Sequence, residues 1–155
     1  MERFNVFGAD YTYSEDRPAG YRCGSVRFGP LVGASRIAGT IYELPSGEST
    51  WPYHYEYGSE EWLLVLDGRP TLRHPEGEDE LEPGDLVCFP DGPGGAHKLT
   101  NRGDEPARLM IMSTFQRPAV AVFPDSDKIG VWPNGGEDTL LAERASGVDY
   151  WHGEA

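Results

Sequence analysis

Two histidines and two glutamates stand at spacings that could build a metal site. His54 and Glu56 are separated by one residue within a strand-like segment, so their side chains lie on the same face of that strand. Glu61 begins the next strand-like run, and His97 lies in a third. If these strands fold over one another, the four side chains converge in one interior. Imidazoles and carboxylates that converge in this way favour a divalent metal, because the cation offsets the cost of burying charge.

Short strand-like runs recur through the middle of the chain and would have to position these side chains. Turn sequences rich in Gly, Pro and Asp, such as Asp67-Gly68, separate the runs. The predicted strands cover residues 34–44, 50–57, 61–66, 70–73, 85–90, 96–101 and 107–115. Regularly spaced short strands predict an all-β sandwich or barrel. Helical periodicity is weak, and its best candidate is the short segment 137–145.

The segment around the first histidine resembles the first sequence motif of the cupin superfamily, a group of small β-barrels. The family motif runs Gly, about five residues, His-x-His, three or four residues, Glu, six residues, Gly. This chain has Gly47, six residues, His54-x-Glu56, four residues, Glu61, six residues and Gly68. The second histidine of the family motif is therefore a glutamate here.

The segment around the second histidine resembles the second cupin motif. The family motif runs Gly, five residues, Pro-x-Gly, a short gap, His, three residues, Asn. This chain has Gly84, five residues, Pro90-x-Gly92, four residues, His97, three residues and Asn101. The gap before the histidine is two residues longer than in the family.

The resemblance covers about residues 35–115 and implies a cupin-like double-stranded β-helix, or jelly-roll, barrel. Residues 1–34 are then expected to form an N-terminal arm that packs on the barrel or on a partner subunit. Residues 116–155 are expected to form a C-terminal extension. Aromatic residues scattered through both flanking segments favour packing over free linkers.

The resemblance also implies that His54, Glu61 and His97 are metal ligands, whereas Glu56 stays open between two roles. Its strand position matches that of a family ligand. This favours a shell of two histidines and two carboxylates around a divalent ion (Zn, Fe, Mn or Ni) rather than copper. As a non-ligand, Glu56 would stand beside a two-histidine, one-carboxylate triad as a candidate general base. A metal-free cupin is the third alternative.

These features predict a metal-dependent enzyme, an oxidoreductase of the dioxygenase type or an isomerase, that acts on a small organic molecule inside the barrel. Strand alternation places Leu63, Val65 and Leu99 on the inner face as pocket residues, with Ile41 or Tyr42 as further candidates. The alternative is a non-catalytic module that binds or senses a small ligand. The chain has no Gly-x-Ser-x-Gly elbow and no phosphate-binding Gly-rich loop, which disfavours serine nucleophiles and nucleotide cofactors.

Charge and composition exclude other classes of function. The chain carries 26 acidic and 13 basic residues and a net charge of −13, which disfavours binding to nucleic acids or membrane surfaces. Cys23 and Cys88 are far apart and form no CxxC motif, and Cys88 is expected to be buried. No apolar run approaches the ~18–20 residues of a membrane span, and the N-terminus is unlike a signal peptide, so a cytoplasmic location is expected. An exposed aromatic face would suit a homodimer.

Overall fold

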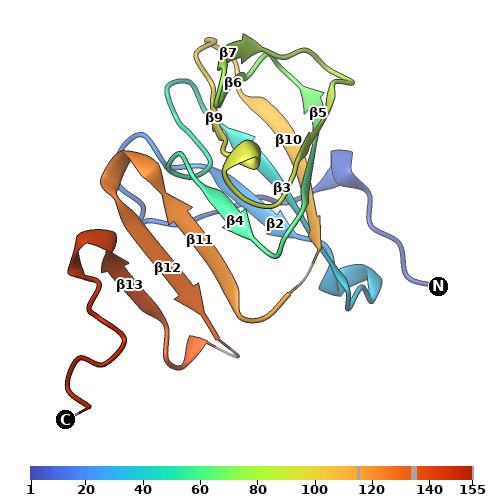
Figure 1. Ribbon diagram of the computed structural model, residues 1–155. Helices are drawn as coiled ribbons and strands as arrows, with labels where there is room; N and C mark the ends of the chain where they lie inside the picture. The colour runs from blue at the N-terminus through green and yellow to red at the C-terminus, as the bar shows by residue number, and fades with distance from the viewer. Residues whose placement is uncertain (115, 134–135, 155) are drawn as a thin grey trace.

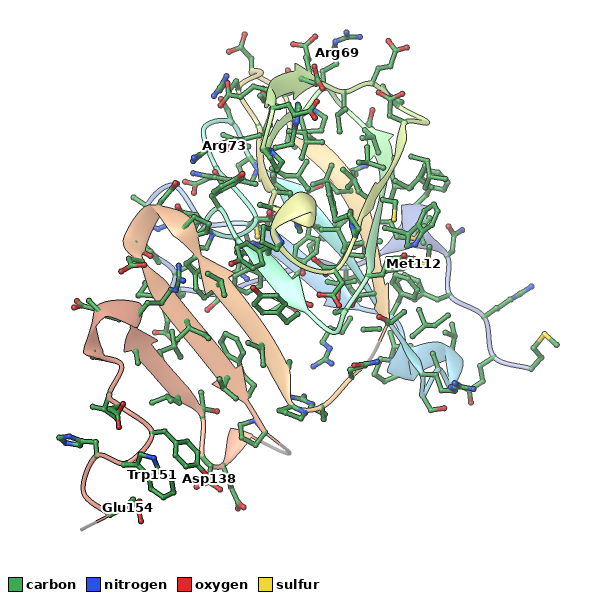
Figure 2. The ribbon with its side chains drawn as sticks, in the orientation of Figure 1. Arg69, Arg73, Met112, Asp138, Trp151 and Glu154 are labelled. Atoms are coloured by element: carbon green, nitrogen blue, oxygen red, sulfur yellow. The ribbon has the colours of Figure 1, made fainter. Side chains whose placement is uncertain are left out.

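The structure is a computed structural model that describes residues 1–114, 116–133 and 136–154, and it is built from β-strands (Figure 1). The strands are β1 (Thr12–Tyr13), β2 (Gly24–Arg27), β3 (Ile37–Leu44), β4 (Tyr55–Tyr57), β5 (Glu61–Asp67), β6 (Thr71–His74), β7 (Gly77–Glu80), β8 (Leu86–Phe89), β9 (Lys98–Thr100), β10 (Ala107–Thr114), β11 (Ala119–Phe123), β12 (Lys128–Trp132) and β13 (Leu140–Glu143). Short 3-10 helices join them: η1 (Val6–Gly8), η2 (Pro30–Val32), η3 (Pro93–Gly95), η4 (Pro124–Ser126) and η6 (Arg144–Ser146). No helix in these ranges is long and apolar enough to cross a membrane.

Antiparallel pairing joins the strands into three sheets. The strand orders are β1-β2-β3-β10-β5-β8, β7-β6-β9 and β13-β12-β11-β4. In the largest sheet β10 pairs with both β3 and β5, so strands far apart in the sequence are neighbours, as a jelly roll requires. Figure 1 shows the four-stranded sheet at one side of the molecule, with the C-terminus beyond β13. The predicted all-β jelly-roll fold is confirmed.

The hydrophobic core lies between the six-stranded and three-stranded sheets, because alternate residues of each strand face inward. Leu63, Val65 and Leu99 are all within 1% of complete burial. Burying each such side chain contributes roughly 1.5–3 kcal/mol. The prediction that Cys88 is buried is wrong: Phe89 beside it points into the core, and alternation turns Cys88 out to solvent.

The C-terminal extension is part of the sheet that carries β4. β11 pairs with β4 in the register Ala121↔Glu56 and Val122↔Tyr55, and β12 and β13 continue the sheet outward. Tyr55 and Val122 belong to a second, smaller core cluster. The extension therefore fixes the strand on which Glu56 lies.

The helical candidate at 137–145 is wrong. Leu140–Glu143 forms β13, whose residues Leu140 and Leu141 pair with Val131 and Gly130 of β12. The pairing partner comes from a neighbouring hairpin strand, and it overrides the weak helical periodicity of the isolated segment.

The N-terminal segment adds two strands to the edge of the largest sheet. β2 pairs with β3, and β1 pairs with β2. The Phe28 ring covers Gly39 of β3 so closely that a Cβ at this glycine would overlap the ring. β1 and β2 therefore extend the largest sheet beyond β3. The division of the chain into an arm, a barrel and an extension stays a prediction, and its boundary at residue 115 falls outside the described residues.

Candidate metal centre

His54 and His97 face each other across an isolated antiparallel bridge. The His54 amide donates to the His97 carbonyl oxygen at 3.1 Å, and the His97 amide donates to the His54 carbonyl oxygen at 2.8 Å. Directly opposed residues of an antiparallel pair point to the same side of the sheet. The two imidazole rings accordingly lie with their centroids 4.7 Å apart.

Both imidazoles are oriented by main-chain carbonyl groups. His54 Nδ1 lies 2.9 Å from the carbonyl oxygen of Pro52, and His97 Nδ1 lies 2.9 Å from that of Gly95. Since a carbonyl oxygen only accepts, each Nδ1 carries the proton and donates it, which leaves each Nε2 with a free lone pair. Main-chain acceptors of this kind commonly orient metal-binding histidines.

Gly95 belongs to η3, which is formed by the Gly-rich gap before His97. A Cβ at Gly95 would overlap the main chain of Pro90, so only glycine fits at this position. The Gly-rich gap thus forms the turn that presents a carbonyl oxygen to His97.

Glu61, the first residue of β5, lies beside the two histidines. Its Oε2 lies 3.5 Å from His97 Nε2. One ligand atom from each of His54, Glu61 and His97 lies within 4.8 Å of the others, and this is the one such group among the described residues. The structure thus brings together three of the four predicted ligands.

Burial sets the charge state of this group. Burial, and then neighbouring His54, lowers the pKa of His97 to about 3. Burial, and then the nearby Glu56 carboxylate, raises the pKa of Glu61 to about 8. Two neutral imidazoles and a carboxyl group that resists ionisation are the state expected when no cation is present. A divalent cation would replace the Glu61 proton and accept both Nε2 lone pairs, so the donor set fits a metal.

Glu56 lies outside the group of three but lines the same cavity. It sits in the middle of β4, and its main-chain carbonyl accepts from the Gly92 amide at 2.8 Å. Burial raises the pKa of its carboxyl group, and a hydrogen bond from the Ser59 side chain opposes that shift.

Two aromatic rings hold the histidines in place. Phe89 stacks on His97 with a centroid distance of 3.8 Å and an interplanar angle of 8°. Phe123 stacks on His54 at 5.9 Å. Phe123 comes from β11 in the C-terminal extension and was not among the predicted site residues. Residues 119–123 form an apolar run between two prolines, and this local pattern indicates a strand.

A cavity of about 690 Å³ opens above the three residues, with walls from the six-stranded and four-stranded sheets. Tyr42 and Ile111 supply part of its apolar wall. The expected pocket residues are not part of the described lining: the structure places Leu63, Val65 and Leu99 in the closed core. The cavity wall instead includes four residues of the two flanking segments that were not among the predicted site residues: Arg27, Phe123, Lys128 and Trp132.

The middle of this chain is similar to a known protein family. Residues 40–113 match the model of the family described as Cupin domain. No curated protein shows a significant match.

Solved structures resemble this chain over more than its middle segment. A candidate sugar phosphate isomerase from Acidithiobacillus ferrooxidans is 23% identical with a TM-score of 0.83, over 93% of this chain and 91% of that chain. A sugar phosphate isomerase of the cupin superfamily from Silicibacter pomeroyi is 22% identical with a TM-score of 0.81, over 93% and 94%. The polyketide cyclase RemF from Streptomyces resistomycificus is 22% identical with a TM-score of 0.61, over 77% and 83%. At these identities the likeness shows the fold alone.

Proposed function

This chain carries a cupin domain, and we propose that it is a metal-dependent enzyme that acts on a small organic molecule in the cavity of about 690 Å³. The observation that carries the proposal is the convergence of His54, Glu61 and His97 at the cavity, with both imidazole Nδ1 atoms already engaged by carbonyl oxygens. Two histidines and one carboxylate leave coordination positions open for a substrate.

These three residues would hold a divalent ion of Zn, Fe, Mn or Ni. When bound, such an ion binds substrate oxygens and polarises a carbonyl group or, in the case of iron, supports chemistry with dioxygen. Tyr42 and Ile111 line the cavity, where they would contact apolar atoms of a substrate and keep bulk water from that side of it.

An isomerase is favoured over a dioxygenase. The two solved structures that align over 93% of this chain are named as sugar phosphate isomerases, one of them as a candidate. Isomerisation of a hydroxy-carbonyl compound moves a proton between neighbouring carbon atoms, and this requires a group that accepts and returns the proton. Glu56 lines the cavity and lies outside the group of three, so we assign its carboxylate this role rather than that of a fourth ligand.

Metal titration tests the ligand set. Protein freed of metal with a chelator is titrated with Zn²⁺, Fe²⁺, Mn²⁺ and Ni²⁺, and wild type is expected to bind one equivalent of at least one ion. Glu61→Gln should lose that binding. Glu60→Gln is the matched control, because Glu60 is exposed and its Oε1 accepts from Trp62 Nε1 outside the cavity. Wild-type protein that binds none of these ions stoichiometrically would end the proposal.

The role of Glu56 is tested with aldose and ketose phosphates in deuterated water. Wild type is expected to interconvert a pair and to incorporate solvent deuterium. Glu56→Gln should keep its equivalent of metal but lose exchange and turnover by about 10²–10⁴-fold. If this variant loses its metal as Glu61→Gln does, Glu56 is a ligand and the assignment of a base is wrong.

A non-catalytic binding module is the second candidate. It is favoured because Glu56 stands where the first family motif has its second histidine, which leaves two histidine ligands. Tight binding of a small molecule by the metal-loaded protein, with neither turnover nor deuterium exchange, would select this candidate.

A further inference from the structure

The cavity concentrates positive charge in an acidic chain. Acidic residues outnumber basic ones by 26 to 13, yet Arg27, Arg117 and Lys128 all line the cavity. The acidic residues in the described lining are Glu56 and Glu61, which belong to the proposed catalytic group. A cavity of this composition attracts an anion that the rest of the surface repels.

Among the residues that the structure describes, Arg27 and Lys128 have no carboxylate partner. Within the described ranges neither of them makes an ion pair, although Glu143 is the cross-strand neighbour of Lys128. The arginines that do pair with carboxylates lie elsewhere: Arg69, Arg73, Arg102, Arg108 and Arg144. Arg117 donates instead to the main-chain carbonyl oxygens of Trp132 and Pro133. Arg27 and Lys128 thus have charge available to a ligand.

The Phe123 ring lies between Lys128 and His54 of the candidate metal centre. The ammonium nitrogen of Lys128 lies 5.6 Å from the centroid of the Phe123 ring, and that ring stacks on His54 at 5.9 Å. Arg27 ends β2 on the opposite wall, in the six-stranded sheet. A small molecule in the cavity can therefore meet the metal ligands and both cations.

Neither cation belongs to the segment that matches the cupin family. That match spans residues 40–113, whereas Arg27 precedes it and Lys128 follows it. Both residues come from the flanking segments that pack on the barrel. Their placement is a property of the whole chain and does not follow from the barrel motifs.

From these observations we propose that the cavity binds a small anionic molecule whose anionic group, a phosphate or a carboxylate, is held between Arg27 and Lys128. Its hydroxyl or carbonyl oxygens then face His54, Glu61 and His97. The inference rests on the proposed function in one respect, that this cavity is the substrate site. It adds the charge of the substrate and the residues that select for it.

The test uses the full chain without metal, so that it does not depend on metal binding. Inorganic phosphate and acetate are titrated separately into chelator-treated protein at constant ionic strength, with glycerol as the neutral control. The fluorescence of Trp51 and Trp132, which line the cavity, reports binding. Saturable binding of phosphate, acetate or both is expected, with no response to glycerol.

Matched variants locate the anion. Arg27→Gln and Lys128→Gln should each weaken binding about tenfold, as expected for the loss of one charge-assisted contact. Arg36→Gln and Lys98→Gln remove the same charges outside the cavity lining and should leave binding unchanged. Thermal melting checks that each variant is folded.

Each outcome decides the proposal. Binding of phosphate identifies a phosphorylated substrate class, and binding of acetate alone identifies a carboxylated one. The proposal is overturned if neither anion binds, if Arg27→Gln and Lys128→Gln bind as wild type does, or if the two control variants weaken binding equally. Failure of wild type to bind metal would instead refute the metal-dependent enzyme and leave the anion result standing.

Discussion

Replacing Glu61 by glutamine should stabilise the metal-free protein while it abolishes metal binding. The pKa of the Glu61 carboxyl group is raised from 4.5 to about 8, first by burial and then by Glu56. A raised folded-state pKa leaves stability intact below the unfolded value and removes it as pH rises toward the folded value. The metal-free protein therefore loses stability between about pH 4.5 and pH 8 on account of this one group, and a neutral glutamine avoids that loss.

The magnitude follows from the shift. One pKa unit corresponds to ~1.4 kcal/mol, so the folding penalty of Glu61 is about 3 kcal/mol at pH 7 and about 1 kcal/mol at pH 5. Glutamine keeps the shape of the side chain and can still donate to His97 Nε2. His97, whose pKa is lowered to about 3, is present in both proteins, so its own pH dependence largely cancels in the difference.

Urea unfolding of chelator-treated proteins at pH 5, 6, 7 and 8 measures this difference. The free energy of unfolding of Glu61→Gln should exceed that of wild type by an amount that grows with pH. Saturating metal should reverse the order, because only wild type gains binding free energy. Glu60→Gln, at an exposed position, should show no such growth. A Glu61→Gln variant that is equal to or less stable than wild type at every pH would refute this reasoning.

Two further predictions concern the frame of the site. Gly95→Ala should lower the melting temperature and weaken metal binding by at least tenfold, because its Cβ would overlap Pro90 and displace the carbonyl oxygen that accepts from His97. Gly94→Ala is the control: its Cβ position has open space, so thermal melts and metal titrations should give wild-type values. Asn101→Leu should lower the free energy of unfolding in urea by about 2–4 kcal/mol, because buried Asn101 donates from Nδ2 to the carbonyl oxygens of Leu44 and Glu105. An unchanged urea midpoint of unfolding in that variant would show that these two hydrogen bonds do not stabilise the fold.

Most barrel strands could be predicted because they carry a local pattern of their own. The exception is β7 (Gly77–Glu80), which was not predicted because all four of its residues are exposed and none is a large apolar residue. The run 61–66 alternates between inward and outward residues and ends at Asp67-Gly68, and the structure gives β5 as Glu61–Asp67. In the C-terminal extension the local pattern is weaker, because β11 is a short apolar run between two prolines and does not alternate between apolar and polar residues. Residues 119–123 read AVAVF and become β11 through pairing with β4 and β12. Pairing between distant segments cannot be inferred from a local pattern, so Phe123 and Lys128 were not assigned to the site.

Alternation predicts the face on which a side chain lies but not its depth in the barrel, and this explains which site residues could be predicted. Glu61 and Val65 share the inner face of β5, but at roughly 3.3 Å per residue they are about 13 Å apart along the strand. Glu61 therefore reaches the cavity, whereas Val65 lies in the closed core. Depth depends on which sheet lies opposite: Glu61 lines the cavity together with residues of the four-stranded sheet, whereas Val65 packs in the core with residues of the three-stranded sheet. The extension supplies Phe123, Lys128 and Trp132 to the cavity wall, and we therefore expect the flanking segments, rather than the barrel motifs, to determine which molecule this protein binds.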